Sequence, residues 1–339
     1  MTSLDAAATI MDADIVETPE TEAPEPVAAT ILDGWSEEQT ASFQKDILTF
    51  RHRLEDTGLF TDAALIDLLE RHPANMLDVC TMGATNDPLY PNKFRTGDFR
   101  DASAADLLAA AKAGCIWINA RKAMNIHADY NAVLKRMYGD LSEATGNRAF
   151  NANGGILISS PVARVPYHFD KTEVILWHVR GQKTVHVWPV SQDFIPDRAV
   201  EATLTNMIED DLPYTAAFED HSTVLKLQPG QGATWPLNAP HRVDNETFCV
   251  SVTTEYSTTE SATKNAAMMT NATLRRYFGM NPLYERDGAV ARRLKSIAGR
   301  VIRKTPLAVN TTGTDMVTFK IDASVEGYVV NVEPFERNF

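Results

Sequence analysis

The chain has 339 residues, of which 44% are hydrophobic and 23% charged, as expected of a soluble globular protein with one or two domains. Its formal net charge of −13 disfavours bulk binding to the nucleic-acid backbone. It has no apolar run of the roughly 18 residues that a membrane span needs and no secretory signal pattern at its start, so we expect a cytoplasmic protein without a membrane segment.

The first segment, residues 1–31, is rich in Ala, Glu, Pro, Thr and Asp, and the first basic residue of the chain is Lys45. Such a composition buries too little apolar surface to offset the entropy lost on ordering. We therefore predict a disordered acidic tail.

Residues 32–150 are predicted to form a helical N-terminal region with one or two strands. Ser36 to Gln39 is typical of a capping box, and Phe43, Ile47, Phe50 and Leu54 recur at helical spacing, which predicts one helix ending near Gly58. Further helices are expected over Thr61–Arg71, Ser103–Ala113 and Ala128–Ala144, with a strand over Cys115–Asn119.

Residues 151–260 read as short strands separated by Gly and Pro turns, which indicates a β-sandwich or barrel rather than a parallel α/β sheet. Arg180-Gly181-Gln182 has the composition of a tight hairpin turn. The expected strands are Gly154–Ser160, Val174–Val179, Lys183–Trp188, Thr223–Leu227, Ala233–Pro236 and Phe248–Tyr256.

Residues 261–339 are expected to form a C-terminal helical segment, from Ser261 to Arg303, followed by a hairpin over Met316–Val332. The stretch from Leu274 to Lys304 is strongly basic. Two interpretations stay open: a solvated helix face, or a docking surface for an acidic partner or for the chain's own acidic tail.

The three cysteines, Cys80, Cys115 and Cys249, are far apart and odd in number, so neither a disulfide framework nor a zinc site is expected. Buried, reduced thiols are the simpler interpretation.

The chemistry-bearing pattern is Tyr167-His168-Phe169-Asp170. On a strand, residues i and i+2 point to the same face, so His168 and Asp170 would converge. His241, flanked by Pro240 after a Gly turn, could supply a second imidazole. Two His and one carboxylate form a facial set that leaves the opposite face of an octahedral Fe(II) open. The other histidines are interpreted as structural: His52, His72, His127, His178, His186 and His221.

The run from Ile156 to Pro189, together with Pro229–Asn245, resembles a JmjC-type cupin, in the branch that includes the HIF asparaginyl hydroxylase and bacterial cupin-like proteins. The resemblance implies a double-stranded β-helix (jelly-roll) core between the helical flanks, and an oxygenase that uses Fe(II) and 2-oxoglutarate. It implies His168, Asp170 and His241 as iron ligands.

The same resemblance implies Lys183 as the cation for the distal carboxylate of 2-oxoglutarate, and Thr253 as a residue near this cosubstrate. Succinate and CO2 would be coproducts, and the substrate would be a protein side chain or a small molecule. The C-terminal helices lie where relatives dimerise, so a homodimer is expected.

The residues themselves add to this interpretation. A Lys among Val and Trp residues would be costly to bury unpaired, and a bound dicarboxylate would supply its partner; an outward lysine is the alternative. Val165 departs from the family, where a hydroxyl residue often stands three before the first metal His; Ser159, Ser160 or Tyr167 could substitute. Three large aromatic residues are candidates for cavity walls, with plain core packing as the commoner alternative at strand spacing: Phe169, Trp177 and Trp188.

Two alternatives remain open from the sequence. One is a cupin that binds a metal or small molecule without turnover, as a sensor or interaction module. The other is a cupin that uses another metal, such as Zn or Mn.

Overall fold

The computed structural model describes residues 30–81, 95–114, 116–161, 163–205, 212, 214–307 and 315–339. The predicted acidic tail lies almost entirely outside the described residues, as does Cys115. The other two cysteines, Cys80 and Cys249, are free and buried, as expected.

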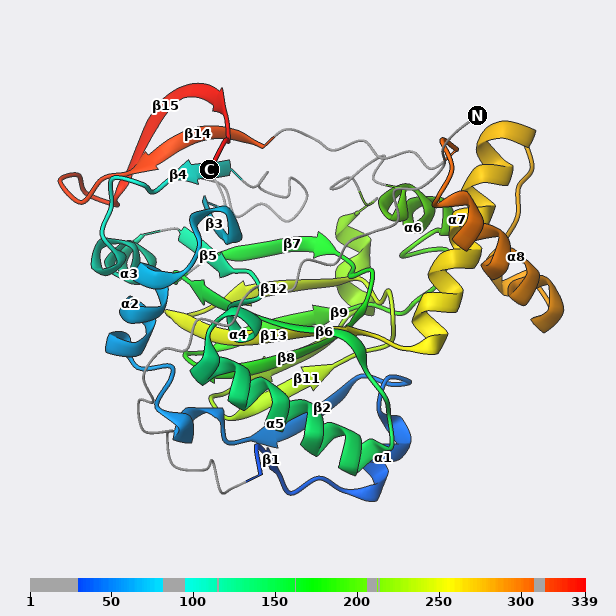
Figure 1. Ribbon diagram of the computed structural model, residues 1–339, viewed down its shortest axis with the longest axis horizontal. Coiled ribbons are helices and arrows are strands. Elements are labelled where there is room, and N and C mark those ends of the chain that lie inside the picture. Colours follow the sequence, from blue (N-terminus) through cyan, green and yellow to red (C-terminus); the bar gives the residue numbers. More distant parts are fainter. Residues whose placement is uncertain are drawn as a thin grey trace, which may run out of the picture.

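The centre of the molecule is built from eight antiparallel strands in two sheets, so the chain is mainly β-structure with helices around it (Figure 1). One sheet has the order β11-β8-β13-β6, within a longer sheet, and the other has the order β10-β9-β12-β7. Their bounds are β6 (Phe150–Ser159), β7 (Arg164–His168), β8 (Glu173–Arg180), β9 (Lys183–Val187), β10 (Thr223–Leu227), β11 (Gln231–Thr234), β12 (His241–Asn245) and β13 (Cys249–Ser257).

The two sheets face each other as a flattened barrel and enclose an apolar interior. Val174 and Leu176 on β8 cluster with Val185 and Val187 on β9 and with Val243 on β12. Because side chains alternate along a strand, the remaining positions of β8, such as Trp177, face the opposite side of the large sheet. The interior is therefore lined by every second residue of each strand.

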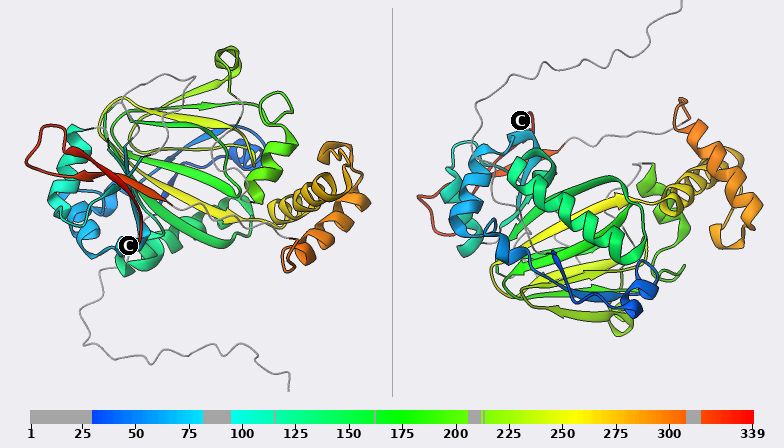
Figure 2. Two further views of the ribbon diagram at one scale, coloured as in Figure 1. Left: turned by 90° about the horizontal axis from the view of Figure 1, so that it is seen from above. Right: turned by 60° about the horizontal axis from the view of Figure 1, so that its bottom comes forward.

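The outer face of the large sheet is covered by helices, which the ribbon views show packed along it (Figures 1 and 2). These are α2 (Asp62–Arg71), α3 (Ala104–Ala113) and α5 (Ala128–Thr145). Apolar residues at helical spacing on α5, such as Val133, Leu134, Met137 and Leu141, join the main core.

The large sheet continues beyond these four strands at both edges. On one side follow β2 (Leu48–His52) and β1 (Leu32–Asp33); on the other follow β5 (Ile116–Ala120), β3 (Leu77–Thr81), β4 (Arg95–Asp98), β14 (Met316–Ile321) and β15 (Val329–Glu336). Residues 32–150 thus carry five described strands where one or two were expected. The predicted C-terminal hairpin is confirmed, and β14 also pairs in parallel with β4.

The predicted long helix from Ser36 to Gly58 is wrong in its second half. The capping box is present between Ser36 and Gln39, but α1 ends at Ser42. Phe50 lies on β2, which pairs with β11, and its ring packs 4.9 Å from that of Trp177. Pairing with a distant strand overrides the local helical spacing. The other three predicted helices and the strand at β5 are confirmed.

The predicted hairpin at Arg180-Gly181-Gln182 is also wrong. β8 and β9 do not pair with each other; they belong to the two different sheets, and the three residues form a corner between them. Gly181 adopts φ +88°, and a Cβ there would lie 2.2 Å from the Phe248 carbonyl oxygen. Only glycine fits that corner.

The C-terminal helical segment comprises α7 (Thr259–Phe278) and α8 (Ala289–Ile302), a pair that projects from the side opposite the β14–β15 hairpin (Figures 1 and 2). Some of its basic residues are bound within the molecule: Arg275 pairs with the buried Glu201 of α6 (Asp197–Leu204), and Lys295 pairs with Asp287. Among the described residues, no helix is long and apolar enough to cross a membrane.

Candidate metal centre

His168 is the last residue of β7, and Asp170 lies in the loop after it. The expectation that His168 and Asp170 share one strand face is therefore wrong, although their side chains do converge. Pro166 sits inside β7, which is tolerated because β7 is the edge strand of its sheet. The chain leaves the sheet directly after His168, and this turn carries Asp170 to the same end of the barrel.

His241 begins β12 and is the cross-strand partner of His168. The two imidazole rings lie 4.1 Å apart, centroid to centroid. The Nε2 atom of His241 lies 3.3 Å from Oδ2 of Asp170. Each of His168, Asp170 and His241 offers one ligand atom, and the three atoms all lie within 4.8 Å of one another.

Both histidines are held in one tautomer by backbone carbonyls. The Nδ1 atom of His168 lies 2.8 Å from the Pro166 oxygen, and that of His241 lies 3.1 Å from the Ala239 oxygen. Since a carbonyl oxygen only accepts, each Nδ1 carries the proton and donates it, which leaves Nε2 with a free lone pair. Such second partners are typical of histidines that bind metals.

Burial keeps His241 in the neutral form that a metal needs. The desolvation of its ring, and then the neighbouring His168, lower the pKa of His241 to about 4. Asn238 supports the acidic ligand by donating its side-chain amide to the Asp170 carbonyl at 3.1 Å.

Lys183 is buried inside the barrel, with only 3% of its surface exposed. The alternative of an outward lysine is therefore wrong. Its Nζ donates to the Ser251 hydroxyl at 2.8 Å, and no carboxylate among the described residues forms an ion pair with it. Desolvation lowers the pKa of Lys183 to about 8. A buried cation without an anionic partner invites an anionic ligand.

Strand register relates this lysine to the three candidate ligands. On β12, His241 faces Val187 and Asn245 faces Lys183, so the two levels are four residues, or about 13 Å, apart along the strand. On β13, Ser251, Thr253 and Glu255 share one strand face. Ser251 contacts Lys183 and Glu255 lies close enough to Asp170 to feel its charge, so Thr253 lies between these two levels on the same face.

Glu255 was not among the site residues predicted from the sequence. Burial, and then the negative charge of Asp170, raise the pKa of this carboxyl group. Its signal was the i, i+2, i+4 spacing from Ser251, which only becomes meaningful once β13 is known to border the barrel interior.

Val165 packs with the apolar interior and pairs with Val243, so it offers no polar contact. Two of the three possible substitutes are engaged elsewhere: the Tyr167 hydroxyl donates to the Phe194 carbonyl, and the Ser160 hydroxyl accepts from the Ile116 amide. Ser159 is buried on β6.

The three aromatic residues predicted as cavity walls lie elsewhere. Trp177 packs into the outer core, Trp188 packs against Tyr167 at 4.9 Å, and Phe169 clusters with Ile195 and neighbours beside α7. The aromatic ring beside the candidate ligands is that of Trp235, which lies 4.5 Å from the His241 ring.

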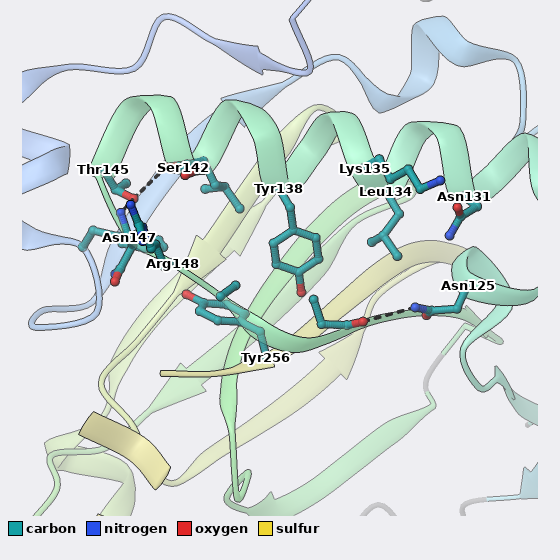
Figure 3. Close-up of a pocket in the computed structure, with 14 residues that line it drawn as sticks. Asn125, Asn131, Leu134, Lys135, Tyr138, Ser142, Thr145, Asn147, Arg148 and Tyr256 are labelled. Carbon is teal, nitrogen blue, oxygen red and sulfur yellow. Dashed lines mark hydrogen bonds between the residues drawn. The ribbon is translucent and has the colours of Figure 1, made fainter. Parts of the chain in front are cut away.

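Cavities also open outside the barrel interior. One, of about 580 Å³, runs along α5 and is lined by Tyr138 and Tyr256 among others (Figure 3). A second, of about 630 Å³, is lined by α6, α7 and the segment Pro236–Asn238. Through Asn238 the second cavity borders the loop that holds Asp170.

No protein-family model and no curated protein matches the chain. Among solved structures it is similar to that of E. coli ycfD, with 14% identity over 81% of this chain and 70% of that one, and a TM-score of 0.46. A structure of YcfD, a ribosomal oxygenase from E. coli, in complex with cobalt and 2-oxoglutarate has 15% identity, coverage of 78% and 64%, and a TM-score of 0.43.

An RmlC-like cupin from Shewanella frigidimarina covers 32% of this chain and 68% of its own, with 13% identity and a TM-score of 0.21. At TM-scores below 0.5 these likenesses carry no conclusion about function, which rests on the geometry of this chain.

Proposed function

We propose that this protein is an Fe(II)- and 2-oxoglutarate-dependent oxygenase that hydroxylates a protein side chain or a small molecule, with succinate and CO2 as coproducts. The observation that supports it is the convergence of His168, Asp170 and His241 within one barrel that also buries the ammonium of Lys183, which has no carboxylate partner in the part of the chain that the structure describes. A metal site alone would not require a buried cation further along the interior.

The donor set fits Fe(II). Two imidazole nitrogens and one carboxylate oxygen form the facial arrangement that non-haem Fe(II) oxygenases use. Catalytic zinc sites also use three protein ligands, so the buried Lys183, which suits a keto acid, favours the oxygenase. Iron bound here would, with the keto acid and molecular oxygen, supply the oxidation that converts a substrate C–H group into C–OH: one atom of O2 would enter the product and the other succinate, as CO2 leaves the keto acid.

The chain's own residues supply the binding and the orientation. Lys183 binds the distal carboxylate of the cosubstrate, and Thr253 lies beside the cosubstrate between this carboxylate and the metal. The carbonyls of Pro166 and Ala239 hold the two imidazole rings with Nε2 toward the metal. Apolar side chains such as Val185 and Val187 exclude water from the interior.

The strand order supports the proposed architecture. Strands β6 to β9 alternate between the two sheets, as do β10 to β13, and the two halves meet where β9 pairs with β10, which is the order expected of a double-stranded β-helix. We propose residues 151–260 as this core, residues 32–150 as the N-terminal region, and residues 261–339 as the C-terminal appendage.

The test is the release of succinate from 2-oxoglutarate by the purified protein with Fe(II) and ascorbate, compared with Asp170→Ala. We expect slow release by the wild type alone, because such turnover does not need the prime substrate. Iron-loaded protein that neither binds 2-oxoglutarate nor forms succinate would instead be a non-catalytic cupin. Activity with Zn or Mn but not Fe would overturn the metal assignment. Substrate candidates are then found by mass spectrometry as species that gain one oxygen.

We also propose a homodimer through the C-terminal helices. On α8, Val290, Leu294, Ile297 and Val301 recur at helical spacing and are all more than half exposed. A stripe of this kind is typical of a helix that packs against a partner. Light scattering should give twice the chain mass for the wild type and the monomer mass for Leu294→Glu, while the matched control Arg293→Glu stays dimeric. A monomeric wild type would exclude the dimer.

A further inference from the structure

We propose that Ser251 and His178 are positioning residues for Lys183, and that they hold its ammonium group where the distal carboxylate of 2-oxoglutarate binds. This inference rests on the proposed function. It concerns how the lysine is placed, and neither residue need touch the metal.

The contacts form one chain of hydrogen bonds with a fixed direction. The Nζ of Lys183 donates to Ser251 Oγ at 2.8 Å, and Ser251 Oγ lies 3.1 Å from His178 Nδ1. The Nε2 of His178 lies 2.9 Å from the Gly181 carbonyl oxygen. Because the Gly181 carbonyl oxygen only accepts, Nε2 of His178 carries the ring proton. Nδ1 then accepts a hydrogen bond from the Ser251 hydroxyl.

This direction leaves the lone pairs of Ser251 for Lys183. Because the Ser251 hydroxyl uses its one hydrogen in the bond to His178, it can only accept a hydrogen bond from the ammonium group. One N–H of Lys183 is thereby fixed, and two remain for a carboxylate. His178 therefore sets the orientation of Ser251, and Ser251 sets that of Lys183.

The chain of bonds is anchored at its far end by the corner between the sheets. Gly181 adopts φ +88°, a conformation that turns its backbone at the place where His178 binds. The same corner is held by the Thr247 hydroxyl, which accepts from the Gln182 amide at 2.9 Å. The position of Lys183, two residues after Gly181, is thus coupled to a rigid turn.

The hydrogen bonds that run from Lys183 through Ser251 to His178, which together form the relay, are buried. Ser251 and His178 are both fully buried. Burial and the charge of Lys183 lower the pKa of His178 to about 3, so its ring stays neutral and keeps Nδ1 as an acceptor. The other ionisable groups nearby are Cys249 on β13, next to Lys183, and His52 on β2, next to His178. Burial raises the pKa of the Cys249 thiol and so favours its uncharged form. Neither group supplies a carboxylate that could replace Ser251 as the anchor.

The first test is calorimetric titration of 2-oxoglutarate into anaerobic, Fe(II)-loaded protein. Ser251→Ala should weaken binding about 10-fold, since a hydrogen bond to a charged group is lost, without loss of iron. Its KM for 2-oxoglutarate should rise while kcat at saturation changes little. Ser251→Thr, which keeps the hydroxyl, should restore most of the affinity.

The matched control is Thr234→Val. It removes another buried hydrogen bond, which the Thr234 hydroxyl on β11 donates to the Val174 carbonyl on β8. It should leave the affinity unchanged. An equal loss in Thr234→Val and Ser251→Ala would show a general effect of destabilising the sheet and would overturn the proposal.

A double-mutant cycle tests whether the residues act in series. His178→Asn is too short to reach both Ser251 and Gly181, and should weaken cosubstrate binding less than Ser251→Ala does. The double variant should be no weaker than Ser251→Ala alone, because both act through one lysine. Additive losses would mean that His178 does not act through Ser251.

The last test does not depend on cosubstrate, so it separates this inference from the proposed function. NMR titration of the Lys183 side chain in the metal-free full-length protein should show a lower midpoint in Ser251→Ala than in the wild type, since the ammonium loses its acceptor. An unchanged midpoint would overturn the relay even if the wild type binds 2-oxoglutarate. A wild type that binds no 2-oxoglutarate would overturn the proposed function and its use of the relay together.

Discussion

The Nε2 atom of His241 lies 3.3 Å from Oδ2 of Asp170, although one residue begins β12 and the other follows β7. Register creates this proximity, because His241 pairs directly with His168 at the end of the small sheet. The loop after His168 then needs only two residues to bring a carboxylate beside both rings.

Alanine substitution of any of the three candidate ligands should abolish stable iron binding. His168→Ala, Asp170→Ala and His241→Ala each remove one of three donors, and a site with two donors holds Fe(II) weakly. Metal analysis of anaerobically loaded protein should give less than about a tenth of the wild-type content. His186→Ala is the matched control, since His186 pairs with Asp244 on the same sheet; equal iron in all four variants would refute the assignment.

Lys183→Met should stabilise the protein without cosubstrate while removing cosubstrate affinity. The substitution replaces a buried cation, which has no carboxylate partner among the described residues, by an apolar side chain of similar length. The gain should be on the order of 1–3 kcal/mol, seen as a higher midpoint of urea unfolding at pH 7. Iron content should not change. A variant less stable than the wild type would indicate an anionic partner within the protein.

Glu173 predicts a pH dependence of stability. It is buried, accepts from the Thr258 hydroxyl at 3.2 Å, and its burial raises its pKa to about 7 from an ordinary value of 4.5. The folded state therefore binds more protons than the unfolded state between these two values, so this group's contribution falls as pH rises from about 4.5 to 7. Glu173→Gln should be more stable than the wild type at pH 8 and should lose this slope. Parallel stability curves for the two proteins would contradict the prediction.

Gly181→Ala should destabilise the corner between the sheets. The new Cβ would lie 2.2 Å from the Phe248 carbonyl oxygen, at a residue with φ +88°. We expect a loss of about 2–4 kcal/mol in the free energy of unfolding, larger than for glycines with positive φ and open space around them. Gly279→Ala, at φ +63° with nothing within 4 Å, is the matched control.

Much of the candidate site could be predicted from the sequence because its parts are local or strongly marked. His168 and Asp170 are two residues apart, His241 follows a proline, and Lys183 stands out in an apolar strand. Lys183 is buried as its strand predicted, and its binding of the cosubstrate carboxylate stays a prediction.

What could not be predicted depends on register between distant strands. The segment from Phe43 to Leu54 carries apolar residues at helical spacing, yet Leu48–His52 within it forms a strand because it pairs with β11. The corner at Gly181 looks like a hairpin until β8 and β9 are known to belong to different sheets. The link from Lys183 through Ser251 to His178 likewise needs the pairing of β8 with β13.

The most direct measurement of the central claim is a crystal structure of the protein grown anaerobically with Fe(II) and 2-oxoglutarate. We predict one metal ion bound by Nε2 of His168, Nε2 of His241 and the carboxylate of Asp170, with the keto acid on the metal and its distal carboxylate against Lys183. A metal held by other residues, or a keto acid whose distal carboxylate lies away from Lys183, would contradict the account.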